Sequence, residues 1–212
     1  MSRTRRCVVA VAVVTAVATL GACGGGGGNA GASRHALSGV IRTPPLEVGT
    51  VSLPDASPGA GDAPFVMRSQ PGDLLLVYFG YTSCPDICPT TLSDIGRAVQ
   101  RLPAADRNRV SVAMVTVDPD RDTGSVMTSY LDHFVHGGHA LRTTDPVQQQ
   151  QAQDAFRVVA KRVDDGASYS FEHTAVTYVV DEHGTVVLEW PFGVSPAAIS
   201  DDLQTLLHRN AA

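Results

Sequence analysis

The 212-residue sequence is poor in the features that mark nucleic-acid-binding and disulfide-rich proteins. Its formal net charge is −5, so it lacks the excess of positive charge with which proteins bind nucleic acid. It contains only four cysteines, whereas a small exported disulfide scaffold carries several pairs spread along the chain. No internal repeat is visible. With 43% hydrophobic residues, the chain is nonetheless long and apolar enough for one ordinary domain with its own core.

The N-terminal apolar run is too short to cross a bilayer. Residues 7–20 form 14 small and apolar positions after three arginines, whereas a membrane-spanning helix needs about 20 residues. A charged start followed by a short apolar stretch predicts a cleaved export signal. Without this segment, which holds no acidic residue, the net charge falls to −8.

Leu-Gly-Ala-Cys follows directly at residues 20–23 and resembles the lipobox of bacterial lipoproteins. We therefore predict a lipoprotein signal peptide at residues 1–22, a lipid on Cys23, and a flexible glycine-rich tether at residues 23–38. Several acyl chains on one residue would hold the protein durably on the extracytoplasmic face of the cell membrane. A chance cysteine after an ordinary export signal is the alternative.

Two cysteines remain for the mature domain. Cys7 would leave with the signal and Cys23 would carry the lipid, so only Cys84 and Cys88 are left. One close pair suggests redox or metal chemistry rather than a disulfide scaffold.

Strand and helix patterns alternate along the rest of the chain. A continuous apolar run at residues 74–79 predicts a strand buried on both faces, and residues 110–117 predict a second strand. Shorter strands are expected at residues 48–53, 65–67 and 140–143, and a terminal hairpin at residues 174–180 and 185–189. Helices are expected from residue 89 to 102, from the 118–123 loop to about residue 135, from 146 to 163 with Ala152, Phe156 and Val159 inward, and from 196 to 208.

This alternation predicts an α/β fold, with a mixed central sheet flanked by helices on both faces. The element order, with a cysteine pair opening the first core helix and a hairpin before the last helix, is that of a thioredoxin-like domain. Insertions and an N-terminal strand extension would be added to it. We assign the domain to residues 39–212.

The cysteine pair lies where the first core strand runs into the first core helix. Backbone N–H groups and the positive end of the helix dipole should lower the thiol pKa there, below the free value of about 8.5. Helical residues four apart have Cβ atoms about 5–6 Å apart, whereas a disulfide needs about 3.8 Å. The spacing therefore favours a bound metal, although oxidation stays open if the turn deforms.

The small number of ligands narrows the choice of metal. Soft thiolates select Cu(I), zinc or iron–sulfur clusters. A structural zinc or a cluster needs about four protein ligands, and only two cysteines remain for the predicted mature domain. Cu(I) accepts two or three ligands, and an added imidazole would accommodate Cu(II).

Residues 78–92, Tyr-Phe-Gly-Tyr-Thr-Ser-Cys-Pro-Asp-Ile-Cys-Pro-Thr-Thr-Leu, resemble the Sco/SenC family of copper-binding, thioredoxin-like proteins. The resemblance covers about residues 46–207. It includes Val-Asp-Pro-Asp-Arg-Asp-Thr at residues 117–123 and Ser-Tyr-Ser-Phe-Glu-His-Thr at residues 168–174. It implies that His173, from the last of these motifs, is a ligand. Without the resemblance, a lone histidine here would more often be an ordinary polar residue.

The resemblance therefore implies a copper site made of Cys84, Cys88 and His173. Two positions depart from the family pattern, which often has His at Ser83 and Asp at Glu172. Neither is a ligand in that pattern, but the second change could alter how the imidazole is held.

Two functions follow from the resemblance. The first is a metallochaperone without turnover, which delivers copper to the oxidase subunit that carries the dinuclear copper site of cytochrome c oxidase. The second is a thiol–disulfide oxidoreductase that reduces the cysteine pair of that target site. A thiol peroxidase is a third hypothesis, but no motif besides the cysteine pair supports it.

Other candidate residues have simpler interpretations. His133, His136 and His139 could hold a metal, but a solvated helix terminus explains them better, because histidine suits the negative end of a helix dipole. His183 is expected to be exposed in a hairpin turn. Asp118 could position the cysteine turn or help to cap the helix that follows it.

Overall fold

The computed structural model describes residues 36–209. The predicted signal peptide, Cys7, Cys23 and most of the predicted tether lie outside the described residues. Within residues 36–209 no helix is both long enough and apolar enough to span a membrane.

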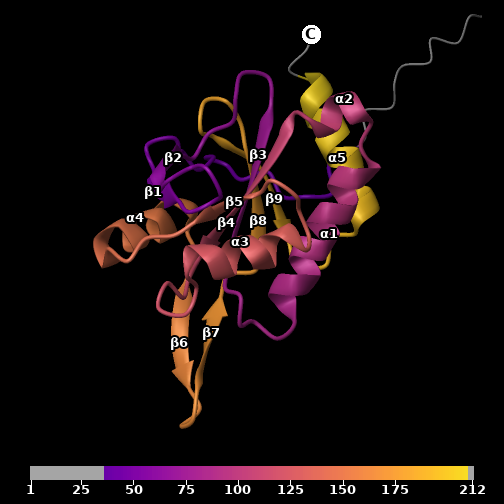
Figure 1. The fold of residues 1–212 in the computed structure, drawn as a ribbon. Helices are drawn as coiled ribbons and strands as arrows, with labels where there is room; N and C mark the ends of the chain where they lie inside the picture. The colour runs from indigo at the N-terminus through magenta and orange to yellow at the C-terminus, as the bar shows by residue number, and fades with distance from the viewer. Residues whose placement is uncertain (1–35, 210–212) are drawn as a thin grey trace, which may run out of the picture. The chain divides into compact units, whose positions relative to one another are not determined.

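A seven-stranded mixed sheet forms the centre of the domain, in the order β2-β1-β5-β4-β3-β8-β9 (Figure 1). The three strands β3, β4 and β5 are parallel, and the β8–β9 hairpin adds antiparallel to β3. At the other edge β1 and β2 continue the sheet in antiparallel fashion, which is the expected N-terminal strand extension. The strand bounds are Ser52–Asp55 for β1, Ala63–Val66 for β2, Leu74–Gly80 for β3, Val110–Thr116 for β4, His139–Leu141 for β5, Val176–Val180 for β8 and Val186–Pro191 for β9.

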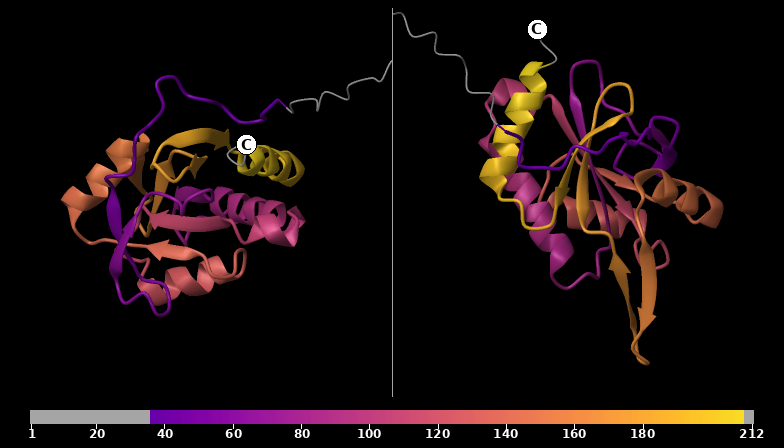
Figure 2. Two further views of the ribbon diagram at one scale, coloured as in Figure 1. Left: turned by 90° about the horizontal axis from the view of Figure 1, so that it is seen from above. Right: turned by 180° about the vertical axis from the view of Figure 1, so that it is seen from behind.

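Helices cover both faces of this sheet, and α1 and α5 run side by side on one of them (Figure 2). Tyr78 and Phe79 are successive residues of β3 and therefore point to opposite faces. Phe79 packs on Phe156 of α4 with ring centroids 5.2 Å apart, whereas Tyr78 lies on the side of α1, beside Cys88. The helix bounds are Ile87–Arg101 for α1, Ala104–Arg107 for α2, Gly124–Asp132 for α3, Pro146–Phe156 for α4 and Pro196–Arg209 for α5.

β3 is the most buried strand of the sheet. All seven of its residues are buried, as the continuous apolar run predicts for a strand covered on both faces. β3 leads directly into the turn that opens α1, so the cysteine pair follows the most buried strand of the core. The fold is thioredoxin-like, and the predicted α/β class is confirmed.

The predicted helix at residues 146–163 is wrong in its second half. α4 ends at Phe156, because Arg157 adopts a left-handed conformation with φ of 57° and donates its N–H to the Asp154 carbonyl. The β-branched Val158 and Val159 follow it out of the helix. Val159, which was expected to face inward, is 69% exposed.

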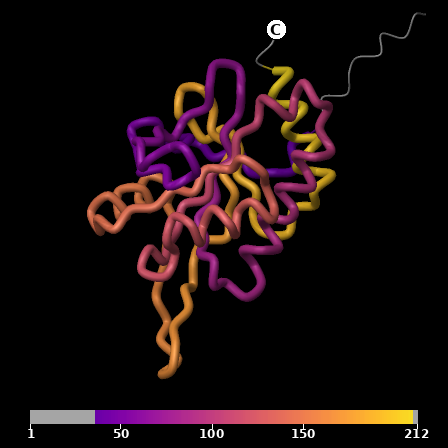
Figure 3. The backbone as a smooth tube through the Cα atoms, in the orientation of Figure 1, coloured from indigo at the N-terminus to yellow at the C-terminus, as the bar shows by residue number. Residues whose placement is uncertain are grey.

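The chain then forms a hairpin that the sequence patterns did not indicate. β6 (Ala160–Asp164) pairs antiparallel with β7 (Tyr169–His173) in a separate two-stranded sheet. This hairpin projects from the body of the domain (Figure 3). Its base pairs Ala160 with His173, so the hairpin places the predicted histidine ligand close to the body.

Candidate metal centre

Cys84 and Cys88 lie in the turn between β3 and α1, as predicted. Cys84 precedes the helix and is half-buried, whereas Cys88 is in the first turn of α1 and fully buried; both are free thiols. Asp86 occupies the N-cap position without making a side-chain cap hydrogen bond. Instead, the Cys88 N–H donates to Cys84 Sγ at 3.4 Å. The start of the helix therefore directs an N–H at sulfur, which suits a negative charge on Cys84.

His173 is the last residue of β7 and faces the cysteine turn. Its Nε2 lies 3.3 Å from Cys88 Sγ, and its Nδ1 lies 3.1 Å from the Thr174 carbonyl oxygen. Because a carbonyl only accepts hydrogen bonds, Nδ1 carries the proton and Nε2 presents its lone pair to Cys88. A backbone carbonyl behind a histidine is a usual way to orient a metal ligand. Glu172, where the family pattern often has Asp, points to solvent and does not perform this task.

The three side chains form one cluster. Their two sulfurs and the imidazole nitrogen all lie within 4.8 Å of one another. Two thiolates and one imidazole suit Cu(I) and Cu(II), whereas a structural zinc site needs a fourth protein ligand. Among residues 36–209 this is the only such group of three or more His, Cys, Asp or Glu side chains. The fold therefore brings together the residues that the sequence motifs singled out.

The environment of Cys88 differs from the prediction. Burial raises the pKa of its thiol to about 12, and the nearby Tyr78 hydroxyl acts in the opposite direction. The expected fall in the pKa of this thiol is therefore wrong, since the loss of hydration disfavours the thiolate more than the helix start favours it. Burial also lowers the pKa of His173, which keeps the imidazole in the neutral form that binds metals.

The acidic loop after β4 anchors the cysteine turn through Asp122. This carboxylate is fully buried and accepts hydrogen bonds from the Thr82 N–H at 3.1 Å, the Thr82 hydroxyl at 2.5 Å and the Thr116 hydroxyl at 2.6 Å. Since Thr82 lies two residues before Cys84, these bonds fix the backbone from which the first sulfur is presented. Asp122 lies inside the motif at residues 117–123, where the sequence alone does not distinguish it from the neighbouring Asp118 and Asp120.

Asp118, in the same loop, holds the other ligand-bearing segment. Its carboxylate accepts a hydrogen bond from the Tyr169 hydroxyl at 3.0 Å and pairs with Arg121. The Arg121 guanidinium stacks 3.8 Å from the centre of the Tyr169 ring and donates to the Tyr169 carbonyl at 2.9 Å. Thr123, not Asp118, caps α3 by accepting the Val126 N–H. Asp118 was expected either to position the cysteine turn or to cap the following helix. The structure shows that it instead positions the β6–β7 hairpin.

The remaining histidines lie apart from the cluster. His133 contacts the Ser129 carbonyl, while His136 and His139 pair with the carboxylates of Asp132 and Asp55 at 2.9 and 2.7 Å. His133 follows the last residue of α3, as expected for a helix terminus, whereas His139 lies in β5. His183 is exposed, as expected for a hairpin turn.

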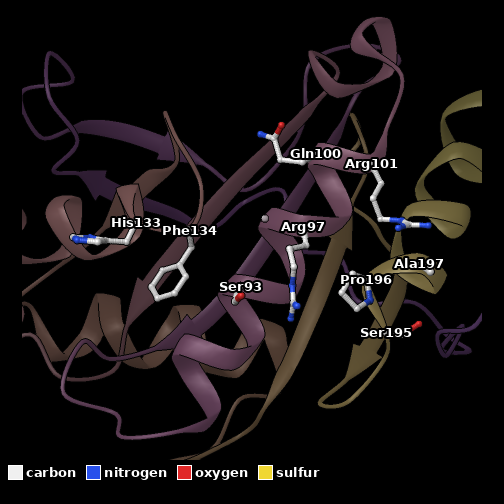
Figure 4. Close-up of a pocket in the computed structure, with 10 residues that line it drawn as sticks. Ser93, Arg97, Gln100, Arg101, His133, Phe134, Ser195, Pro196 and Ala197 are labelled. Atoms are coloured by element: carbon white, nitrogen blue, oxygen red, sulfur yellow. The ribbon is translucent and has the colours of Figure 1, made fainter.

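A groove of about 640 Å³ lies between α1, the residues after α3 and the start of α5 (Figure 4). Its lining includes Arg97, Arg101 and Phe134, and it contains none of the three clustered side chains. The groove and the metal centre are therefore separate features of the surface.

Both the sequence and the fold of this chain are similar to those of known proteins. The SCO1/SenC family model matches residues 62–208. The SCO2-like protein of Rickettsia felis is 36% identical over 138 residues, which cover 63% of this chain and 65% of the relative, so the chain spans less than two thirds of that protein's length.

Two solved structures extend the comparison. The structure of Bradyrhizobium japonicum ScoI with copper bound is 30% identical, covers 80% of this chain and 98% of that one, and has a TM-score of 0.62. The apo Sco1 protein from Thermus thermophilus is 32% identical, with coverage of 84% and 98% and a TM-score of 0.66. With the family model matching well over half of its residues, this chain belongs to the SCO1/SenC family.

Proposed function

We propose that this protein is an extracytoplasmic copper chaperone that binds the ion through Cys84, Cys88 and His173. The convergence of two sulfurs and one imidazole nitrogen within 4.8 Å carries the proposal, because the set matches the donors that copper prefers in both valences. The copper in the related ScoI structure from Bradyrhizobium japonicum supports the same assignment.

The three ligands differ in access, which suits a protein that gives its metal away. Cys88 is buried, whereas Cys84 and His173 are both half-buried. A ligand from a partner can approach copper on the side of these two residues and exchange with one of them first. The buried Cys88 sulfur and the remaining ligand then retain the ion until the partner completes its own ligand set.

Anchoring and the partner are part of the same proposal. A lipid on Cys23 would keep the domain at the extracytoplasmic surface of the cell membrane, and the lipobox-like residues 20–23 support it. Membership in the SCO1/SenC family supports the cytochrome c oxidase subunit with the dinuclear copper site as the recipient.

Replacing His173 with Ala tests the copper site. We expect the reduced wild-type protein to bind one Cu(I), and its Cu(II) form to show a thiolate-to-copper charge-transfer band. His173→Ala should lose most of the Cu(II) complex and less of the Cu(I) complex, because two thiolates suffice for Cu(I). Metal analysis and visible spectroscopy measure both, and His183→Ala, at an exposed histidine outside the cluster, is the matched control.

The same variant separates copper binding from thiol–disulfide exchange, the second candidate function. The two free thiols at the start of α1 favour that candidate, since an N–H already points at Cys84 Sγ. Exchange needs the cysteines but not the imidazole, so a reductase would keep its activity in His173→Ala and lose it in Cys84→Ser. An unchanged Cu(II) spectrum in His173→Ala would contradict the assignment of His173.

A further inference from the structure

Tyr78 carries a buried hydroxyl that has no hydrogen-bond partner within residues 36–209. Its side chain is fully buried on β3, on the side of the sheet that α1 covers. Nearly all buried hydroxyls in proteins are hydrogen-bonded, because an unpaired one loses its contacts with water and gains none in return. An unused donor at this position therefore calls for a functional reason.

The Tyr78 ring lies against the metal centre. A Cβ atom added at Gly80 would lie 2.7 Å from Cε1 of Tyr78 and 3.1 Å from Cys88 Sγ, so the ring edge and the sulfur border the same small space. The His173 ring stands edge-on to Tyr78 with centroids 6.2 Å apart. Tyr78 thus borders two of the three clustered side chains, and Gly80 leaves the room for it.

Copper binding decides whether this donor has a partner, because a cysteine that binds a metal does so as a thiolate. As a neutral thiol, Cys88 is a weak acceptor, and its sulfur already contacts His173 Nε2 at 3.3 Å. As a thiolate it accepts strongly and keeps lone pairs after binding a metal.

We propose that Tyr78 is a positioning residue whose hydroxyl donates a hydrogen bond to the Cys88 thiolate in the copper-loaded protein and thereby favours Cu(I) over Cu(II). The inference rests on the copper site proposed above. A donor at sulfur withdraws electron density from it, and hydrogen bonds to thiolate ligands are known to set the preference of a metal for its valences. The Cys88 sulfur keeps more negative charge when it binds Cu(I) than when it binds Cu(II). The hydrogen bond from Tyr78 should therefore stabilise the Cu(I) complex more than the Cu(II) complex.

Tyr78→Phe tests this role, because it removes the hydroxyl and keeps the ring. The thiolate-to-Cu(II) charge-transfer band should move to longer wavelength. The preference for Cu(I) over Cu(II), measured by competition with chelators for each valence, should fall about tenfold, as expected for one charge-assisted hydrogen bond. The melting temperature of the metal-free variant should equal or exceed that of the wild type, because an unpaired buried hydroxyl is lost without leaving a cavity.

Tyr178→Phe is the matched control. Tyr178 is also buried, but it packs on Phe79 and Phe156 on the opposite side of the sheet. Its variant should keep the wild-type band and the wild-type copper preference.

Two results would overturn the inference for Tyr78 alone. The first is an unchanged charge-transfer band and an unchanged preference for Cu(I) over Cu(II) in Tyr78→Phe. The second is a lower melting temperature of the metal-free variant together with weaker copper binding, which would indicate a merely structural role. A wild-type protein without any thiolate-to-Cu(II) band would instead overturn the copper site, and the role of Tyr78 with it.

Discussion

Burial of Cys88 determines how its sulfur becomes available to a metal. The thiol pKa is raised to about 12, so Cys88 stays protonated in the metal-free protein at ordinary pH. A metal ion must displace that proton, and binding is therefore coupled to proton release. The cost of forming a buried thiolate falls only when copper is present to compensate its charge.

The affinity for Cu(I) should accordingly rise with pH. Between about pH 7 and pH 9, proton release from Cys88 alone should contribute about a tenfold gain per pH unit, since its pKa lies above this window. Competition with a Cu(I) chelator of known pH dependence measures the slope. In Cys88→Ser, the number of protons released for each Cu(I) bound, which sets the slope, should fall by one. A wild-type Cu(I) affinity that does not change with pH would contradict a raised pKa for the buried Cys88 thiol.

At the scale of elements, the metal centre joins two segments that one loop holds in place. The loop after β4 binds the cysteine turn through Asp122 and the β6–β7 hairpin through Asp118 and Arg121. Phe171 of the hairpin also donates its N–H to the Tyr81 hydroxyl at 3.3 Å. Together with the pairing of Ala160 with His173 at the base of the hairpin, these contacts fix His173 relative to the sulfurs.

Tyr169→Ala should therefore loosen the hairpin without unfolding the domain. The variant loses the hydrogen bond to Asp118 and the ring on which Arg121 and Arg162 stack, at 3.8 and 3.6 Å from its centre. Hydrogen exchange should become faster in residues 160–173 and stay unchanged in β3, while the Cu(II) complex weakens. Lys161→Ala, at an exposed position on the same hairpin, should leave both unchanged. Equal exchange rates in Tyr169→Ala and wild type would show that the stack does not hold the hairpin.

At the scale of the whole molecule, the proposed lipid on Cys23 decides where the copper site works. Cys23→Ser should shift the exported protein from the membrane fraction to the soluble fraction, because the acyl anchor is lost. Fractionation followed by immunoblotting measures the change. Cys7→Ser, within the predicted signal peptide, is the control and should stay in the membrane fraction. A Cys23→Ser protein that remains membrane-bound would rule out this anchor.

Local patterns in the sequence were sufficient for most of the fold. The apolar run at residues 74–79 predicted β3, because a strand buried on both faces is apolar throughout, and the largely apolar residues 110–117 predicted β4. The same patterns failed after Phe156, where apolar residues continue at helical spacing but the backbone at Arg157 is left-handed. Periodicity describes which side chains can be buried, and it does not show where a helix ends.

The sequence by itself therefore determined the thioredoxin-like domain and the cysteine pair at the start of a core helix, because both depend on neighbouring residues. Only the tertiary structure decided the rest of the centre. It brought His173 to within 3.3 Å of Cys88, buried that thiol enough to raise its pKa, and left the Tyr78 hydroxyl without a partner. Each of these properties depends on segments far apart in the chain, whose distances and desolvation exist only once the core has formed.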